Sequence, residues 1–493
     1  MVKTSVIIDC FTDEASGYGA PPFLSTHSRY LFGCLRSEGY KVFYLTFDDL
    51  RYAAKKKISA DDLSSKKELR NTTKNRDRVK EIMMNCDELN IVLGRFVNYS
   101  YVSSVPPDLD ELLSQISLFN MYKRLFYIMP FEFIESDFRI KLRKNFDEVI
   151  TSPIINHFFN KEDHFTAIDQ ISVFSAEILD QLLNPIIVEL ETVMGCNHKP
   201  GCRFCAESLI KSKPQYRPVD EIVKEVQAFY KHGGLYFRLG KQPNFYNYME
   251  SDPKAYKELF QKIHKAAPKL RLLHIDNTSP QDIVTNKGVE ITKLIVKYCS
   301  PGNVGSFGVE SFDPEVREEN NLNSNVKDIM DAIRIMNKYG SGRGLNGLPK
   351  LLPGLNLIYG LKGQNKDTWK INLEALKSIY KENLLTRRTF VRKLTSMSGH
   401  LEVVPDKDMV NFEHYKTAVN KIYSLPMIKR VIPAGTILKD VRSEIIQYDK
   451  TIFRHLATNP IRIIVNKKIL PNTFANIKIT SHIDGFTVRG ELV

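Results

Sequence analysis

The sequence predicts an α/β protein with an N-terminal doubly wound α/β domain, a central full or partial (β/α) barrel and a small C-terminal β-barrel. Three observations predict this fold class. Short apolar strands alternate with helix-like stretches over residues 1–185, strand–helix pairs recur over residues 186–425, and short strands separated by turn residues fill residues 426–493. These ranges are the expected domains.

The N-terminal domain is expected to hold a parallel sheet. Strands are predicted at 5–9, 41–46, 90–93, 125–128 and 148–151, with a helix at 28–37. The loop 11-FTDEASGYGAPP-22 follows the first strand, where such sheets bind ligands. It has no GxGxxG pattern, so a dinucleotide is not indicated, and no D-x-H-x-x-G stretch supports a cobalamin with a histidine as its lower ligand.

The central domain is expected to place its chemistry at the carboxyl ends of its strands. Strands are predicted at 186–192, 235–242, 271–277, 303–311, 354–361 and 387–394. A helix is expected at 219–231, because apolar residues recur there at helical spacing and Gly233 and Gly234 follow.

The C-terminal domain is expected to be a β-barrel with a basic surface. Strands are predicted at 461–465, 475–480 and 487–492. Residues 426–493 hold eleven Lys and Arg against five acids, and the chain has a net charge of +13, so a polyanion such as RNA is an expected partner. The residues expected to contact RNA are Lys429, Arg430, Arg442, Arg454, Arg462, Lys467, Lys468 and Arg489, with Phe453, Phe474 and Phe486 as stacking faces.

Composition places the protein among soluble globular proteins. Hydrophobic residues make up 43% and charged residues 26% of the chain. No apolar run approaches the roughly 18 residues of a membrane span, and the N-terminus does not read as a signal peptide. A cytoplasmic protein without a membrane partner is expected, in which thiols stay reduced.

Three of the seven cysteines lie in the stretch 191-ETVMGCNHKPGCRFCAES-208, directly after the first strand of the central domain. Cys196, Cys202 and Cys205 are spaced C-x5-C-x2-C. An odd number of cysteines in a reducing compartment argues against disulfides. Two metal sites remain open from the residues alone: zinc with His198 as the fourth ligand, or an iron–sulfur cluster held by three thiolates.

This loop resembles the cluster loop of the radical S-adenosylmethionine (SAM) superfamily, which most often shows C-x3-C-x2-C. The resemblance implies that Cys196, Cys202 and Cys205 hold a [4Fe–4S] cluster, with Phe204 as the aromatic residue before the last cysteine. In that family an external electron donor reduces the cluster, and SAM is cleaved to methionine and a 5′-deoxyadenosyl radical. The resemblance therefore implies an enzyme, although it assigns no catalytic residue.

Three further stretches follow in the order of the superfamily. The stretch 238-RLGKQPN-244 stands where the family binds the SAM ammonium, which implies a role for Gly240, Lys241 and Gln242. In 307-FGVES-311, Glu310 matches the residue that binds the SAM ribose and Ser311 follows it. In 356-NLIYGLKGQNKDT-368, Gly360 and Gly363 match the glycine turn after the strand that backs the adenine.

The whole chain looks like an archaeal family of uncharacterised radical SAM iron–sulfur proteins, and its domain order is similar to that of the tRNA methylthiotransferases. That likeness implies modification of a tRNA base through a TRAM-like C-terminal barrel. Methylthiotransferases hold a second cluster on three N-terminal cysteines; Cys10, Cys34 and Cys86 are three in number, but the last two are not in strand-end loops. Two alternatives stay open: modification of a protein or small molecule, and a non-catalytic metal-bearing RNA-binding protein.

Overall fold

The protein is described from a computed structural model, which covers residues 2–11, 24–55, 71–94, 106–128, 136–159, 163–183, 185–205, 213–394 and 410–493. The chain forms two compact units. The first comprises residues 1–189 and 223–236, and the second comprises residues 190–222 and 237–493. The three domain boundaries expected from the sequence stay a prediction. Apart from Phe11, the expected ligand loop 11–22 lies outside the described residues.

The first unit is built on a five-stranded parallel sheet with strand order β2-β1-β3-β4-β5. This confirms the expected α/β fold of the N-terminal part. Its strands are β1 (Thr4–Asp9), β2 (Lys41–Thr46), β3 (Glu88–Leu93), β4 (Tyr122–Tyr127) and β5 (Glu148–Ile150). Its helices are α1 (Thr26–Ser37), α2 (Phe47–Lys55), α3 (Val79–Met84), α4 (Leu109–Ile116), α5 (Ser136–Asn145), α6 (Ile154–Phe158) and α7 (His164–Ser175).

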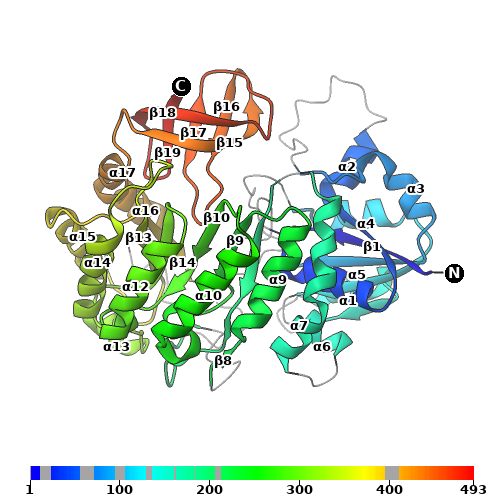
Figure 1. The fold of residues 1–493 in the computed structure, drawn as a ribbon, viewed down its shortest axis with the longest axis horizontal. Helices are drawn as coiled ribbons and strands as arrows, with labels where there is room; N and C mark the ends of the chain where they lie inside the picture. Colours follow the sequence, from blue (N-terminus) through cyan, green and yellow to red (C-terminus); the bar gives the residue numbers. More distant parts are fainter. Residues whose placement is uncertain are drawn as a thin grey trace. The chain divides into compact units, whose positions relative to one another are not determined.

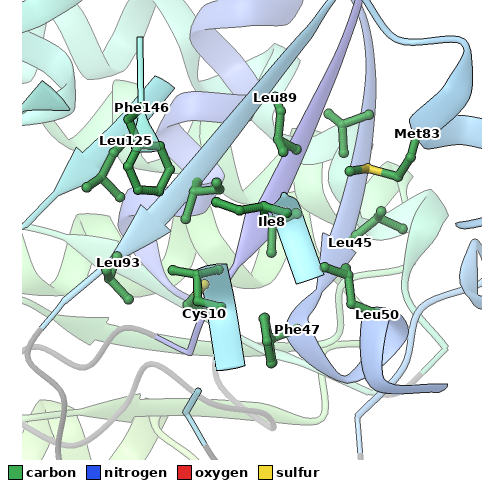
Figure 2. Packing of buried hydrophobic residues seen from close by; sticks show 14 of the residues in the cluster. Ile8, Cys10, Leu45, Phe47, Leu50, Met83, Leu89, Leu93, Leu125 and Phe146 are labelled. Carbon is green, nitrogen blue, oxygen red and sulfur yellow. The ribbon is translucent and has the colours of Figure 1, made fainter. Parts of the chain in front are cut away.

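One face of this sheet packs against α2 to α5 through a continuous apolar core (Figure 2). Ile8 and Cys10 alternate onto that face, as the two-residue period of a strand requires. Cys86 packs at the edge of the same core. Cys34 is buried on α1 and belongs to no part of that core.

The second unit contains a partial parallel barrel. Its strands form two sheets, with strand orders β10-β9-β6 and β11-β12-β13-β14. The bounds are β6 (Ile187–Glu191), β9 (Tyr236–Gly240), β10 (Leu272–Ile275), β11 (Asn277–Thr278), β12 (Asn303–Glu310), β13 (Leu351–Tyr359) and β14 (Arg388–Lys393). Since β11 directly continues β10, six strand positions follow one another, which agrees with the expected barrel.

Helices separate these strands in sequence (Figure 1). They are α9 (Val219–Lys231), α10 (Pro253–Ala266), α11 (Pro280–Ile283), α12 (Asn286–Tyr298), α13 (Pro314–Glu319), α14 (Val326–Gly340) and α15 (Thr368–Lys381), followed by α16 (Phe412–Val419) and α17 (Leu425–Val431). The short strands β7 (Val193–Met194) and β8 (Gln215–Tyr216) pair with each other beyond β6. None of the helices in the described ranges is long and apolar enough to cross a membrane.

The C-terminal part closes into a five-stranded barrel with strand order β15-β16-β17-β19-β18. Its strands are β15 (Ile437–Gln447), β16 (Lys450–Arg454), β17 (Arg462–Val465), β18 (Phe474–His482) and β19 (Thr487–Leu492). β17 and β19 are parallel, and the other neighbours are antiparallel. The expected small β-barrel is therefore confirmed.

The closed barrel docks at the amino ends of the parallel strands, opposite β8 (Figure 1). The backbone N–H of Thr458 donates to Nδ1 of His274 in β10, 3.2 Å away. Burial lowers the pKa of His274 to about 3, so the ring is neutral and can accept this bond. Arg387, which precedes β14, donates to the carbonyl oxygen of Asn459 at 3.0 Å. The closed barrel therefore leaves the carboxyl ends of the parallel strands to the candidate active site.

Candidate active site

The three clustered cysteines lie in the loop that follows β6 and β7. All three side chains are half-buried. Burial raises the pKa of the Cys202 thiol to about 11, and charge on Cys205, Glu310 and Cys196 adds to the increase. The backbone N–H of Asn323 donates to the Cys202 sulfur, which lowers the pKa of this thiol and opposes the increase. Cys196, Cys205 and Glu310 are therefore all within electrostatic range of Cys202.

The cysteine loop is docked on residues 320–323, which follow α13. Nε2 of His198 lies 2.8 Å from the carbonyl oxygen of Asn321, and the Asn321 side chain donates to the carbonyl oxygen of Gly201 at 2.7 Å. The backbone N–H of Arg203 donates to the carbonyl oxygen of Asn320 at 3.0 Å. Because Asn321 takes up Nε2 of His198 in this contact, this nitrogen is not placed as a zinc ligand.

Backbone N–H groups beside this loop donate to the sulfur atoms of two of its cysteines. A [4Fe–4S] cluster needs thiolates at separate irons and N–H donors to sulfur. Two such donors are present: the N–H of Asn323 to Cys202, and the N–H of His198 to Sγ of Cys196 at 3.5 Å. The residues present fit three-cysteine ligation.

Glu310 ends β12 in a strained backbone conformation. Its φ is 59°, a value that favours glycine, and the pairing of β12 with β13 shifts register between Gly308 and Glu310. A Cβ at Gly308 would lie 2.8 Å from Oε1 of Glu310, so the carboxyl group folds back over this glycine. Burial raises the pKa of Glu310 to about 8, and the charges of Arg392 and Arg317 oppose the increase.

Arg317 holds the backbone on both sides of Glu310. Nη1 donates to the carbonyl oxygens of Val309 at 2.7 Å and Ser311 at 2.6 Å. Nη2 donates to the carbonyl oxygens of Asn323, at 2.7 Å, and Ser324. One buried guanidinium thus joins the end of β12 to the loop on which the cysteines dock. Nothing in the sequence pattern marks this arginine, because its partners are carbonyl groups of distant residues.

The predicted residues at and after the end of β9 are held by burial and by hydrogen bonds within the protein. Lys241 has a φ of 56°, and burial lowers the pKa of its amine to about 7. Gln242 is buried; its Nε2 donates to the carbonyl oxygen of Leu239 at 3.0 Å and its Oε1 accepts from Thr192 at 3.3 Å. The Gln242 amide therefore serves to shape the strand end, and Gly240 closes β9.

The remaining predicted residues belong to two turns and one apolar cluster. Ser311 is buried and its Oγ accepts from the N–H of Asp313 at 3.2 Å, which shapes the start of α13. Gly360 has a φ of 100°, and its N–H donates to Oε1 of Gln364 at 2.7 Å. Phe204 packs against a cluster formed by Val316, Leu322 and Leu361.

Comparison with known proteins now identifies the class. The Radical SAM superfamily matches residues 190–376, which include the cysteine loop and Glu310. The chain belongs to this superfamily and is a radical SAM enzyme.

The chain matches two relatives over most of its length. It is 32% identical to an uncharacterised protein of Methanocaldococcus jannaschii, over 98% of this chain and 92% of that protein. It is 30% identical to an uncharacterised protein of Archaeoglobus fulgidus, over 97% and 88%. Among solved structures it is similar to the radical SAM methyltransferase TsrM of Kitasatospora setae, with a TM-score of 0.48 and 14% identity over 79% of this chain and 72% of that one.

Proposed function

We propose that this enzyme binds SAM beside a [4Fe–4S] cluster on Cys196, Cys202 and Cys205 and uses it to modify an RNA base, with a tRNA as the expected substrate. One observation supports the first half most directly. The cysteine loop and Glu310, which is more than a hundred residues further along the chain, lie at carboxyl ends of strands of one unit, and Arg317 joins the end of β12 to the loop 320–323 on which the cysteines dock.

The residues have distinct tasks in this proposal. The three cysteines would hold the cluster, which supplies the electron for reductive cleavage of SAM once an external donor has reduced it. Glu310 would accept hydrogen bonds from the ribose hydroxyls in its ionised form, and these donors would lower its pKa against the burial that raises it to about 8. Arg317 keeps the backbone on both sides of Glu310 in place, and the N–H groups of Asn323 and His198 donate to sulfur.

Gly240, Lys241 and Gly360 stand at the carboxyl ends of β9 and β13, where the rest of SAM would lie, and Phe204 is the aromatic side chain of the cysteine loop. The RNA half of the proposal rests on net charge and on the C-terminal barrel. We propose the cytoplasm as the compartment, since thiol ligation of iron requires reduced cysteines.

The first experiment is anaerobic reconstitution with iron and sulfide. The parent protein should bind about four irons, and single replacement of Cys196, Cys202 or Cys205 by alanine should remove most of them. Cys299→Ala, at a buried cysteine outside the loop, is the matched control and should keep its iron. Stoichiometric zinc with no iron uptake would contradict the cluster.

The second experiment addresses chemistry and substrate. Reduced, reconstituted protein should convert SAM to 5′-deoxyadenosine and methionine. RNA nucleosides from cells with and without the gene are then compared by mass spectrometry. A missing modified nucleoside supports RNA as substrate; an unchanged profile together with an altered protein or metabolite transfers the radical chemistry to one of those substrates.

A further inference from the structure

The closed C-terminal barrel has a topology that suits oligonucleotides. Its first strand, β15, pairs with the second and the fourth, and its third and fifth, β17 and β19, are parallel. Five-stranded barrels of the oligonucleotide-binding type use the face of their second and third strands. Here these strands are β16 and β17, so the residues on their face decide what can bind.

Arginines dominate that face. Arg442 of β15 pairs in register with Arg454 of β16, and Arg462 of β17 lies close enough that its charge helps to lower the pKa of Arg454, which burial lowers first. Glu444 is the one carboxylate that the described ion pairs place among them; it contacts Arg442 and Arg454, both at 3.2 Å. Arg442 and Glu444 are buried and Arg454 is largely buried, so the half-buried Arg462 is the positive group of this row that can reach phosphates.

This surface continues onto the edge strand of the partial barrel. The backbone N–H of Arg462 donates to the carbonyl oxygen of Phe486 at 3.0 Å. The Phe486 ring stacks on Phe390 of β14, with ring centroids 5.5 Å apart and planes 16° apart. The guanidinium carbon of Arg388 lies 2.9 Å from the centroid of Phe390. Phe486, Phe390 and Arg388 therefore form one stacked column.

The column leads toward the candidate active site. Arg388, Phe390 and Arg392 are two residues apart, so they share one face of β14 and span about 13 Å. Arg392 is exposed and lies 5.6 Å from the Phe390 centroid. The positive charge of Arg392 also lowers the pKa of the Glu310 carboxyl group, against the larger increase caused by burial. Positive and planar groups thus run from β17 to the neighbourhood of Glu310.

We infer that this track, made of Arg462, Phe486, Phe390, Arg388 and Arg392, binds single-stranded nucleic acid and guides it from the C-terminal barrel to the active site. Arg462 and Arg392 pair with phosphates, and a base stacks on the column through the guanidinium plane of Arg388. RNA is the nucleic acid that the proposed function requires, and the inference rests on that proposal for the choice of RNA over DNA.

The test measures binding of fluorescein-labelled 12-nucleotide oligo(U) and oligo(dT) to the full chain by anisotropy, over a series of salt concentrations. Arg462→Gln and Arg392→Gln should each weaken binding about 5- to 10-fold and reduce the salt slope by about 0.7, the value for one single-strand phosphate contact. Arg388→Lys keeps the charge, so it should leave the salt slope unchanged while weakening binding about 10-fold through lost stacking.

Arg334→Gln is the matched control, because Arg334 lies on α14 and is paired with Glu382. It should bind both oligonucleotides like the parent. Equal binding by Arg388→Lys and the parent, or competition by polyglutamate as strong as by oligo(U), would show a simple anion surface and overturn the inference. Preference for oligo(U), or equal affinity for both oligonucleotides, supports it.

The two proposals fail separately. SAM cleavage is measured on the parent without any oligonucleotide. A parent that forms 5′-deoxyadenosine but binds neither oligonucleotide at low salt overturns the track and leaves the radical chemistry standing. A parent that binds oligonucleotides through the track but does not cleave SAM overturns the proposed function and leaves the track standing.

Discussion

Replacing Arg317 by methionine is expected to loosen the active site more than any surface change of the same type. The guanidinium donates four hydrogen bonds to carbonyl oxygens of residues 309, 311, 323 and 324. Hydrogen bonds to a charged group contribute about 1.5–3 kcal/mol each, so the gross loss is roughly 6–12 kcal/mol. Methionine keeps part of the packing volume, so the loss comes mainly from these bonds.

Two effects reduce that figure. Burial lowers the pKa of Arg317 from 12.5 to about 10, which corresponds to a cost of about 3 kcal/mol for holding the charge there. Water can also reach some of the freed carbonyl groups, and single substitutions rarely exceed about 4–5 kcal/mol. The expected net loss for Arg317→Met is therefore about 3–4 kcal/mol.

The chain offers a local probe for this measurement. Its one tryptophan, Trp369, lies on α15 in the same unit as Arg317. Urea unfolding followed by tryptophan fluorescence therefore reports on this unit. Arg334→Met, which removes an exposed pair with Glu382, should cost at most about 1 kcal/mol. Iron uptake should also fall in Arg317→Met, because the loop under the cysteines loses two anchors. An urea midpoint equal to that of Arg334→Met, with iron uptake like the parent, would refute this reasoning.

Three further changes test the site and the domain junction. Gly308→Ala places a Cβ 2.8 Å from Oε1 of Glu310, so SAM affinity should fall about 5- to 10-fold by calorimetry, whereas Gly342→Ala, which meets nothing within 4 Å, should bind SAM like the parent. Lys241→Met should stabilise the unit by about 1–3 kcal/mol at pH 7, because burial lowers the pKa of the Lys241 amine from 10.5 to about 7 in the folded protein. This gain in the free energy of unfolding should shrink as the pH rises toward 10.5. A gain that does not depend on pH in urea unfolding would contradict this. Burial lowers the pKa of His274 from 6.5 to about 3, so the unit should lose stability as the pH falls from 6.5 toward 3. His274→Gln should reduce that loss of stability in acid unfolding. An unchanged pH dependence would show that His274 is not its cause.

Most strands were predictable from the sequence, because apolar runs bounded by turns are a local property. The predicted strand 41–46 and helix 219–231 coincide with β2 and α9. The strands β15 and β16 were missed, since β15 shifts register against both neighbours and its polar residues interrupt the two-residue alternation. Local patterns cannot predict such irregular strands.

The candidate site was predictable where it rests on spacing. The cysteine loop and Glu310 follow strands, and the fold of parallel strands brings strand ends together. Arg317 could not be predicted, because its role depends on carbonyl groups in two separate loops. The predicted stacking face at Phe453 was wrong: its side chain is fully buried in the barrel core. The pairing register of the strands decides which residues point into the barrel, and the sequence did not reveal that register.

The C-terminal basic residues illustrate the same limit. Arg430 donates to the carbonyl oxygen of Tyr380 at 2.6 Å and lies over its ring, so it fastens α17 to α15. Arg442 is buried against Glu444 and Asn472. Lys467, Lys468 and Arg489 are exposed. Charge counting predicted the sign of the surface, but not which side chains are taken up inside the protein.

The docking of the cysteine loop also sets an order of events during synthesis. His198 and Gly201 make their contacts with Asn321, which is 123 and 120 residues further along the chain. At roughly 5–20 residues per second, the ribosome needs about 6–24 s to add that length. Throughout this interval the cysteine loop has been synthesised but the residues on which it docks have not. Assembly of a metal centre on the nascent chain would then compete with oxidation, so cells that make this protein are expected to load it only after residues 320–323 have left the ribosome.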